Sequence, residues 1–470
     1  MKQLLKKLQP ADIVFLLLAA VACIYAIFIP PAHGVADQGD FERVMGQAGL
    51  GFFHGHSFYD FVQTKYTLKW MNPLFLIGLL PATSYIYPIA VAKLLCRICF
   101  LGYFDTRVLA AVFSLYYSIV CFLIFRQIPV KNQIGKSVLA AIFIAVFFDG
   151  VNLTMFNSMY GQSMLLIALA SFLLSGVLIL RNLDNLKKRH IVFFFAACVL
   201  LLGAKLQCIS LLPFLILAFV FLIRKCSYKK LSVVLLCILL WYSVGNYVIW
   251  GGQLNRDTQY NSVFYGILKD SQTPEEDLEA MGLDPDLAKD AGKHAYLDPG
   301  EYAYPPRTEI MEEKFYSKMD NVKLAKFYLT HPARIIRAME VTAGNAFHTS
   351  IELGTFSKDA GFEPGAYEYR FDGWSTVRDR LPKTLWFIVP VYILFFAVGL
   401  YELIRRKNLY AGFYLLILCL GLIQFPMPYI GNGNADIVKQ LYLFNITFDV
   451  GLFVAIGYVV AMIKKKVVKK

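Results

Sequence analysis

Apolar runs of about 20 residues recur along most of this 470-residue chain, and they limit its fold more than any other feature. A helix of about 20 apolar residues crosses the hydrocarbon layer of a bilayer. Hydrophobic residues make up 57% of the chain and its mean hydropathy is +0.53. This composition is too apolar for the surface of a soluble protein. The sequence therefore predicts an all-α polytopic membrane protein and excludes a single soluble core.

Charge predicts how the chain crosses the membrane. The formal net charge is +13, but the bases gather in short joints between apolar runs and in the C-terminal tail, whereas acids outnumber bases over residues 251–383. Basic joints face the cytoplasm by the positive-inside rule. That placement puts both termini inside a plasma membrane and requires about ten transmembrane helices. These are expected near residues 13–29, 106–126, 137–149, 163–180, 190–206, 208–223, 231–250, 384–404, 409–426 and 437–462.

One apolar segment does not fit this series of spans. Residues 85–101 carry Lys93 and Arg97 on one face of a predicted helix. If this helix crossed the membrane, every later basic joint would lie outside the cell. We therefore expect an amphipathic helix in the outer leaflet.

Three regions follow from this topology. Residues 1–250 form an N-terminal transmembrane module with a first external loop at 30–105. Residues 251–383 form a large external loop domain of mixed structure, with helix-like stretches at 309–329 and 334–347. Residues 384–470 form C-terminal transmembrane helices with a basic cytoplasmic tail.

The strongest candidate for chemistry is the acidic motif, residues 37–43, which directly follows the first span. It contains three carboxylates and one arginine. Charged groups held beside hydrocarbon are functional candidates. Asp37 or Asp40 could act as a general base, while Glu42 and Arg43 could bind substrate, with Arg43 meeting a phosphate. The alternative is a solvated start of a loop.

Further polar residues are predicted near the external face, and each has a structural alternative. Lys205 and Gln207 could bind a lipid phosphate or simply snorkel. Tyr160 and Gln162 could bind sugar hydroxyls or belong to an ordinary turn. The remaining candidates could bind substrate, or else meet headgroups or form a polar cap. They are His331, Arg334, Asp436 and Lys439.

Familiar catalytic motifs are missing. The sequence has no Walker A, HExxH or GxSxG pattern, so the energy for a reaction must come from the substrate. The basic residues are juxtamembrane, which favours lipid contact over nucleic acid. No spacing predicts a metal site, although Asp37, Asp40 and Glu42 could hold a divalent cation such as Mg²⁺ or Mn²⁺.

At these residues the chain resembles the GT-C superfamily of membrane glycosyltransferases, and most closely the bacterial WsfD-like hexose transferases of cell-surface glycan biosynthesis. The matching segments are spread along the chain. They are residues 37–45, 157–161, 261–270, 328–332 and 431–445. The motif lacks the adjacent Asp-Glu pair of protein mannosyltransferases, and residues 205–207 lack the proline of a Lys-Pro-Gln step found in some relatives.

The resemblance implies a GT-C-like fold and an inverting hexose transfer. The donor would be a polyprenyl-phosphate-linked sugar, and the acceptor a cell-wall or other surface glycan or a lipid-linked molecule outside the cell. An external aspartate would be the base, and either Asp37 or Asp40 could match it. A flippase for lipid-linked glycans is the main alternative, but such carriers commonly show internal repeats, and none is visible here. A non-catalytic scaffold for glycan assembly is a third hypothesis.

Overall fold

The computed structural model describes residues 8–468 except 54 and 57, and it divides into two compact units. Unit 1 contains residues 1–247 and 349–380, and unit 2 contains residues 248–348 and 381–470. Each unit is described by itself. Both are mainly helical, and a small three-stranded sheet lies in unit 1.

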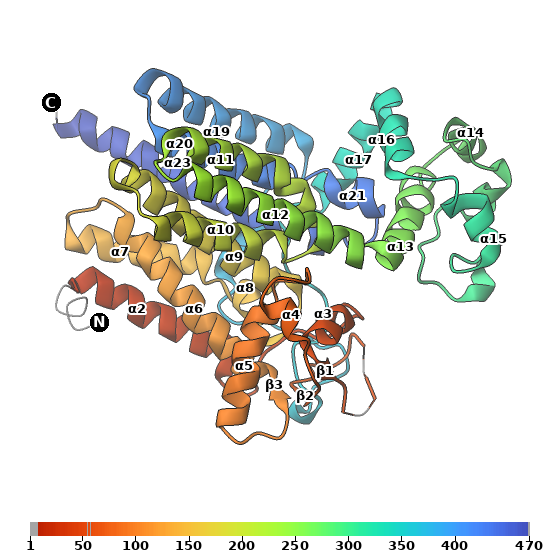
Figure 1. Cartoon of the computed structure of the whole chain (residues 1–470), viewed down its shortest axis with the longest axis horizontal. Coiled ribbons are helices and arrows are strands. Elements are labelled where there is room, and N and C mark those ends of the chain that lie inside the picture. The colour runs from red at the N-terminus through yellow and green to blue at the C-terminus, as the bar shows by residue number, and fades with distance from the viewer. Residues whose placement is uncertain (1–7, 54, 57, 469–470) are drawn as a thin grey trace. The chain divides into compact units, whose positions relative to one another are not determined.

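Unit 1 contains a bundle of long apolar helices (Figure 1). Helix α2 packs on α6 and α7, α6 packs on α9, and α9 packs on α10. All α-helices of unit 1, long and short, are α2 (Pro10–Cys23), α3 (Phe41–Ala48), α4 (Pro73–Leu76), α5 (Ile86–Ile98), α6 (Thr106–Gln127), α7 (Gln133–Phe147), α8 (Gly150–Thr154), α9 (Gly161–Arg181), α10 (Lys188–Leu202), α11 (Leu212–Lys225), α12 (Lys229–Trp250) and α18 (Gly373–Asp379). Helix α12 is the last helix of this stretch, and its final residues fall in unit 2.

The length and composition of the helices confirm a polytopic membrane protein. Eight helices in the described part of the chain are long and apolar enough to span a bilayer. A ninth is added if α7 and the residues 150–157 that follow it, bent by 56° at their junction, form one span. The predicted span at 190–206 corresponds to α10, whose 15 residues cover only about 22 Å. The topology predicted from the basic joints counted this short helix as a span, so ten segments were expected whereas eight or nine meet the length of a bilayer.

A buried polar cluster lies at the junction between α7 and α8. Asp149 Oδ1 accepts hydrogen bonds from the Val151 backbone N–H at 3.1 Å and from the Ser375 hydroxyl at 2.5 Å, and Asp149 Oδ2 accepts the Ser375 backbone N–H at 3.0 Å. Arg378 is completely buried, and its Nη2 donates to the Ser375 hydroxyl at 3.4 Å and to the Thr349 hydroxyl. The cluster thus fastens α18 to the bend between α7 and α8.

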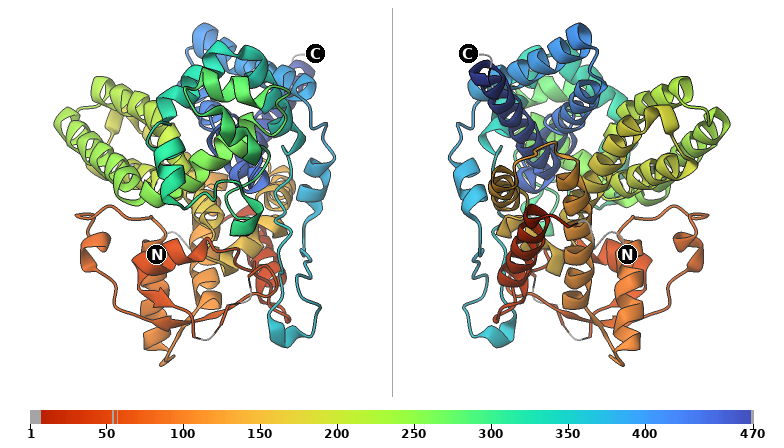
Figure 2. Two further views of the ribbon diagram at one scale, coloured as in Figure 1. Left: turned by 90° about the vertical axis from the view of Figure 1, so that its right-hand side faces the viewer. Right: turned by 90° about the vertical axis from the view of Figure 1, so that its left-hand side faces the viewer.

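The segment 349–380, called here the returning segment, joins unit 1 through its backbone (Figure 2). Its residues 354–356 exchange hydrogen bonds with first-loop residues: Gly34 and Ala36 donate to the carbonyls of Thr355 and Gly354 at 3.1 and 2.8 Å, and Gly354 donates to the carbonyl of Tyr59 at 2.8 Å. A second contact occurs where the Gly150 N–H donates to the Phe371 carbonyl at 2.8 Å. The first loop is therefore completed by residues that lie more than 290 positions later in the chain.

Strands β1 (Leu50–Gly51), β2 (Lys65–Leu68) and β3 (Phe104–Asp105) form an antiparallel sheet in the order β1-β2-β3. Tyr66 of β2 lies opposite Phe104, and Leu50 lies opposite Leu68. The sheet therefore links the residues after α3 to the start of α6, and it gives the first loop a fixed frame.

Helix α5 has the amphipathic character that the sequence predicts for residues 85–101. Its outward residues Val91, Leu94 and Ile98 are 49%, 59% and 61% exposed, whereas Lys93 is buried. Trp70 and Phe100, before and after the helix, are also exposed. Scattered apolar residues are common on protein surfaces, but a row on one helix indicates a surface for lipid or protein.

Unit 2 packs around a core of aromatic and aliphatic side chains drawn from its membrane helices and from the region between them. Its helices are α13 (Gly252–Ser262), α14 (Pro274–Ala280), α15 (Glu309–Met311), α16 (Asn321–Thr330), α17 (Pro332–Gly344), α19 (Leu385–Arg406), α20 (Leu409–Leu422), α21 (Met427–Asn432), α22 (Ile437–Gln440) and α23 (Tyr442–Val468). The helix-like stretch expected at 309–329 is divided, because Asp320 caps a new helix by accepting the Lys323 N–H at 2.7 Å. The second stretch, expected at 334–347, is α17.

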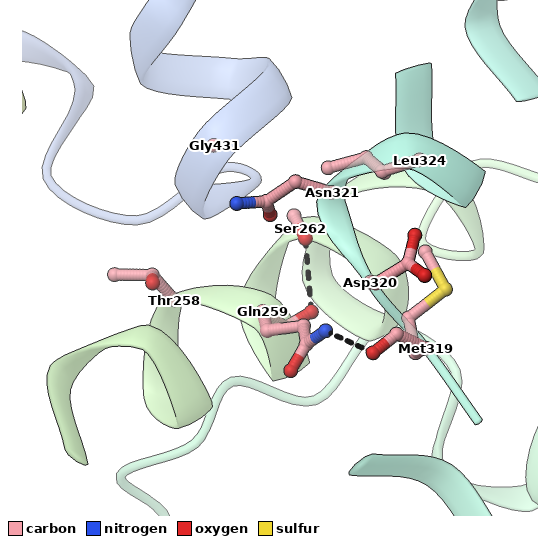
Figure 3. Close-up of a pocket in the computed structure, with 8 residues that line it drawn as sticks. All are labelled: Thr258, Gln259, Ser262, Met319, Asp320, Asn321, Leu324 and Gly431. Carbon is pink, nitrogen blue, oxygen red and sulfur yellow. Dashed lines mark hydrogen bonds between the residues drawn. The ribbon is translucent and has the colours of Figure 1, made fainter. Parts of the chain in front are cut away.

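Unit 2 also contains a small polar cavity of about 220 Å³ (Figure 3). It lies between α13, the start of α16 and Gly431 of α21. Two of its polar side chains are used internally, since Gln259 donates to the Met319 carbonyl at 2.7 Å and Ser262 donates to the Gln259 carbonyl at 2.9 Å. The Gln259 bond connects α13 to the residues before α16.

Candidate functional site

The acidic motif begins with a buried aspartate that organises a tight turn. Asp37 is 2% exposed, and its Oδ1 accepts the backbone N–H groups of Gly39 at 2.8 Å and Phe41 at 3.2 Å. Gly39 has a φ of 103°, a conformation that favours glycine. Because Phe41 is the first residue of α3, the Asp37 carboxylate both closes the turn and satisfies one amide at the start of this helix.

The other oxygen of Asp37 contacts a histidine that the sequence reasoning missed. His56 Nε2 lies 3.0 Å from Asp37 Oδ2, and His56 Nδ1 lies 3.0 Å from the Gln63 side-chain oxygen. Burial raises the pKa of the Asp37 carboxyl, while the two backbone N–H groups and His56 act to lower it. The sequence signal for this contact is that residues 52–58 place two histidines, His54 and His56, between phenylalanines. Of these two histidines, His54 lies outside the described residues.

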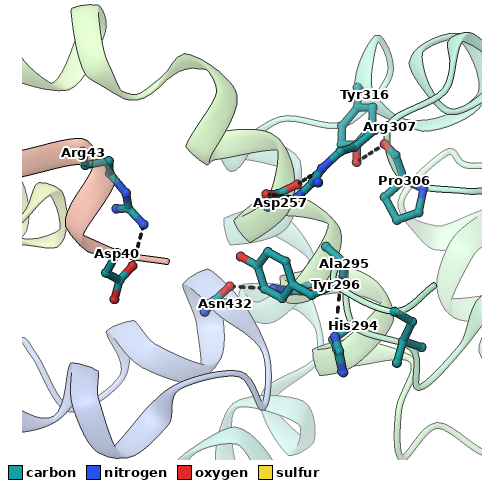
Figure 4. A network of polar contacts seen from close by, with 12 residues as sticks. Asp40, Arg43, Asp257, His294, Ala295, Tyr296, Pro306, Arg307, Tyr316 and Asn432 are labelled. Carbon is teal, nitrogen blue, oxygen red and sulfur yellow. Dashed lines mark hydrogen bonds and ion pairs between the residues drawn. The ribbon is translucent and has the colours of Figure 1, made fainter. Parts of the chain in front are cut away.

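Asp40 and Arg43 form the accessible part of the motif (Figure 4). Arg43 Nη2 donates to Asp40 Oδ1 at 2.9 Å, and the two side chains are 52% and 30% exposed. Glu42 is also exposed in the first turn of α3. The carboxylate of Asp40 can therefore be reached from outside the protein, whereas the side chain of Asp37 is only 1% exposed.

Tyr160 packs against the acidic motif and bonds to the backbone before it. It is 1% exposed, its hydroxyl donates to the Ala36 carbonyl at 3.0 Å, and its ring packs edge-on against Phe41 with centroids 4.8 Å apart. Gln162, the second predicted sugar ligand, is also 1% exposed. In this structure the Tyr160 hydroxyl is committed to the backbone before Asp37, so Tyr160 fixes the position of the motif.

The predicted lysine also belongs to this neighbourhood. A Cβ atom at Gly161 would lie 2.6 Å from Lys205 Cγ and 2.8 Å from the Ala204 carbonyl, so the stem of Lys205 passes directly over the start of α9. Lys205 and Gln207 are both half-buried, and the Gln207 carbonyl accepts the Ser210 hydroxyl at 2.8 Å. Unit 1 thus brings the residues around Asp37, Tyr160 and Lys205 together through successive contacts.

The side chain of Asn157 also holds the first loop in place. Its Nδ2 donates to the His33 carbonyl at 2.8 Å, and its Oδ1 accepts the Thr106 hydroxyl at 2.7 Å. Asn157 is completely buried. It therefore links the beginning of the first loop to the start of α6.

Helix α3 is anchored from α5 by a buried lysine. Lys93 Nζ donates to the carbonyls of Ala48, Gly49 and Lys69 at 2.7, 2.9 and 3.1 Å. Two of these carbonyls lie at the carboxyl end of α3, where a positive charge is favoured. Burial and the nearby Arg97 lower the pKa of Lys93 to about 8. The amphipathic helix therefore holds the far end of the helix that presents Asp40 and Arg43.

We expect Lys93→Met to destabilise the first loop by at least about 2 kcal/mol, because three carbonyl oxygens lose their shared cationic donor. The measurement is the rate of chymotryptic cleavage within residues 30–105 of the protein in detergent. Lys69→Met is the matched control, since it removes the same charge but keeps the carbonyl that Lys93 contacts. Equal cleavage rates in the two variants would contradict the anchoring role.

The four candidates from the later part of the chain lie in unit 2. His331 Nδ1 bonds to the Phe327 carbonyl at 2.8 Å, and Arg334 pairs with Asp277 and donates to Ser271 at 3.0 Å. Lys439 is buried, with Nζ 3.5 Å from Asp436 Oδ2. The His331 ring and the Arg334 guanidinium are thus engaged within unit 2.

The described residues contain no group of three or more His, Cys, Asp and Glu side chains placed to hold a metal ion. Asp37, one of the three carboxylates considered for a divalent cation, has hydrogen-bond partners at both oxygens. The proposed Mg²⁺ or Mn²⁺ requirement stays a prediction.

Comparison with known proteins adds a family assignment. A family model described as the YfdI N-terminal transmembrane domain matches residues 1–470. No curated protein and no solved structure matches the chain significantly. Because the family match covers the whole chain and agrees with the series of membrane helices, this protein belongs to the family of YfdI N-terminal transmembrane domains.

Proposed function

We propose that this protein is an integral membrane glycosyltransferase that moves a hexose from a polyprenyl-phosphate donor to a glycan or lipid-linked acceptor outside the cell. One observation carries the proposal most directly. An accessible carboxylate, Asp40, stands beside a cation, Arg43, at the start of a helix that follows the first membrane span. The resemblance of the acidic motif to that of GT-C enzymes agrees with this chemistry.

In the proposed reaction Asp40 is the general base. It takes the proton of the acceptor hydroxyl as that oxygen attacks the anomeric carbon, and the bond from this carbon to the phosphate oxygen breaks with its electrons on the phosphate. Attack from the face opposite the phosphate inverts the anomeric configuration. The Asp37 side chain is only 1% exposed and accepts the Gly39 amide, so we assign Asp37 the role of shaping the turn.

The leaving phosphate needs positive charge. Arg43 is half-exposed and can exchange its contact with Asp40 for a bidentate contact with phosphate. Lys205 is the second proposed phosphate contact, because its stem lies against Gly161 next to the support of the acidic motif. Glu42, Tyr160, Gln162, Gln207, His331, Arg334, Asp436 and Lys439 remain proposed substrate contacts.

The proposed orientation places both termini in the cytoplasm and the first loop outside. The basic joints between spans support it through the positive-inside rule. The exposed apolar residues of α5 support contact of the first loop with lipid, the medium that also carries a polyprenyl donor. The proposed location is therefore the plasma membrane of a bacterial cell.

A transfer assay in sealed vesicles tests the proposal. Purified protein is reconstituted with a donor lipid labelled in its sugar, and the label is followed into acceptor glycan and across the bilayer. Transfer of the label to acceptor with inversion at the anomeric carbon is the expected result. Movement of intact donor across the bilayer, with no covalent transfer under any acceptor tested, would support the flippase and reject the enzyme.

A further inference from the structure

The contact between Asp37 and His56 is part of a longer chain of hydrogen bonds. His56 lies between Asp37 Oδ2 and the Gln63 side-chain oxygen, each 3.0 Å from a ring nitrogen, and the Gln63 amide nitrogen donates to the Gly55 carbonyl at 3.1 Å. A carbonyl can only accept, so Gly55 fixes which end of the Gln63 amide faces the imidazole. Reversing the amide would place the Gln63 side-chain oxygen against the Gly55 carbonyl oxygen.

This orientation determines where the protons are. The Gln63 oxygen is an acceptor, so His56 Nδ1 must carry a hydrogen. The other ring nitrogen faces Asp37 Oδ2 at hydrogen-bond distance, and one of these two atoms must also carry a hydrogen. An ionised Asp37 beside a neutral His56 would place a lone pair against a carboxylate oxygen, or else against the Gln63 oxygen.

The surroundings of the pair limit its exchange with water. The His56 side chain is 8% exposed, and its ring stacks on Phe52 and meets Phe58 edge-on, with centroids 4.3 and 4.0 Å away. Among the described residues, Asp40 and Tyr66 also interact electrostatically with Asp37. Asp40, itself paired with Arg43, is a like charge near Asp37, and the Tyr66 phenol of β2 is influenced by Asp37.

We infer that Asp37 and His56 together retain one proton that an ionised aspartate beside a neutral histidine would lack, and that this protonated pair positions the turn that presents Asp40. His56 and Gln63 are then positioning residues. They hold Asp37 Oδ2 while Asp37 Oδ1 holds the amides of Gly39 and Phe41. The consequence for catalysis rests on the proposed function, whereas the proton assignment does not.

The direction of the pH dependence follows from the proton count. Burial raises the pKa of Asp37, which favours retention of the proton in the folded protein. As pH rises through the folded value, the proton is lost and one of the two ring contacts of His56, to Asp37 Oδ2 or to the Gln63 side-chain oxygen, becomes a repulsion. The turn then loosens, so we expect transfer to fall on the alkaline side and the folded loop to lose stability in the same range.

Nitrogen NMR of the histidine-labelled protein in nanodiscs tests the proton assignment without any activity. His56→Gln identifies the His56 signals by difference. The expected result at pH 7 is a protonated Nδ1, either in an imidazolium or in the neutral form with only Nδ1 protonated. A neutral ring protonated only at Nε2 would overturn the inference, whatever reaction the protein catalyses.

The pH profile of transfer tests the positioning role. Gln63→Glu adds a negative charge at the Nδ1 side, so it should raise the midpoint of the alkaline fall by about one pH unit or more. Gln63→Leu removes the acceptor and should lower that midpoint. His56→Gln can donate to Asp37 but does not titrate, so the fall assigned to the pair should vanish while part of the activity is kept.

The control is His190→Gln, which changes a histidine at the start of α10 and should leave the midpoint where it is. A purely packing role for His56 would change the level of activity in the variants but not the midpoint, and would overturn the inference. If no variant and no wild-type protein transfers sugar, the proposed function fails, and the NMR result still decides the proton assignment.

Discussion

Replacing Asp40 with asparagine is expected to lower glycosyl transfer by about 10² to 10⁴-fold, because an amide cannot take the proton of the acceptor hydroxyl. The side-chain oxygen of the asparagine can still accept the hydrogen bond from Arg43, so the fold should be retained. The measurement is the initial rate of transfer in reconstituted membranes, with protein quantity and melting behaviour compared with the wild type.

Asp37→Asn is the decisive companion variant. Asparagine keeps an oxygen for the N–H groups of Gly39 and Phe41, and its amide nitrogen can donate to His56 Nε2. It therefore imitates the protonated pair, and we expect at least about a tenth of wild-type transfer, in contrast to the much larger loss for a missing base. Asp37→Leu removes all three contacts and should lose both stability and transfer.

The same two variants also test the opposite assignment, in which Asp37 is the base. Full activity of Asp40→Asn together with an inactive but folded Asp37→Asn would make Asp37 the base. In that case the buried carboxylate would have to become exposed during the reaction, and the turn would be a moving part of the catalyst.

The second large effect is expected at Asp149. Asp149→Leu leaves the buried Arg378 without the carboxylate that organises its cluster, and breaking a buried charge network in this way costs about 3–5 kcal/mol. We expect a corresponding loss of stability when the protein in mixed micelles is unfolded with sodium dodecyl sulfate. The returning segment should become sensitive to protease at the same time.

The double variant Asp149→Leu with Arg378→Met distinguishes charge from packing. Removing both polar groups also removes the buried cation, so at least half of the lost stability should return. A double variant as unstable as Asp149→Leu alone would show that the charge of Arg378 is not what makes the single change costly.

The sequence predicts the membrane helices well because hydropathy directly reports the cost of placing a residue in lipid. It also predicts the amphipathic helix at α5 from the spacing of Lys93 and Arg97, although not the three carbonyls that Lys93 contacts. Charge patterns cannot distinguish a short helix such as α10 from a complete span, and for this reason the expected number of spans was higher than the eight or nine observed.

The acidic motif is visible in the sequence, but the difference between Asp37 and Asp40 is not. Both are aspartates three positions apart, and only folding buries one and leaves the other accessible. His56 and Gln63 could not be assigned to Asp37 because the contact depends on how the loop after α3 turns back. Tyr160 was predicted as a sugar ligand from its place near the predicted external face, and the sequence gives no sign of the bond from its hydroxyl to the Ala36 carbonyl.

The returning segment sets the order in which this protein can mature. The amides of Gly34 and Ala36 find their acceptors only after residues 354 and 355 have been synthesised, long after the first helices have entered the membrane. Until then the backbone around Asp37 has no complete set of partners, and contacts this distant in sequence form late. A nascent chain released by the ribosome before that point would carry every residue of the acidic motif and yet could not assemble it.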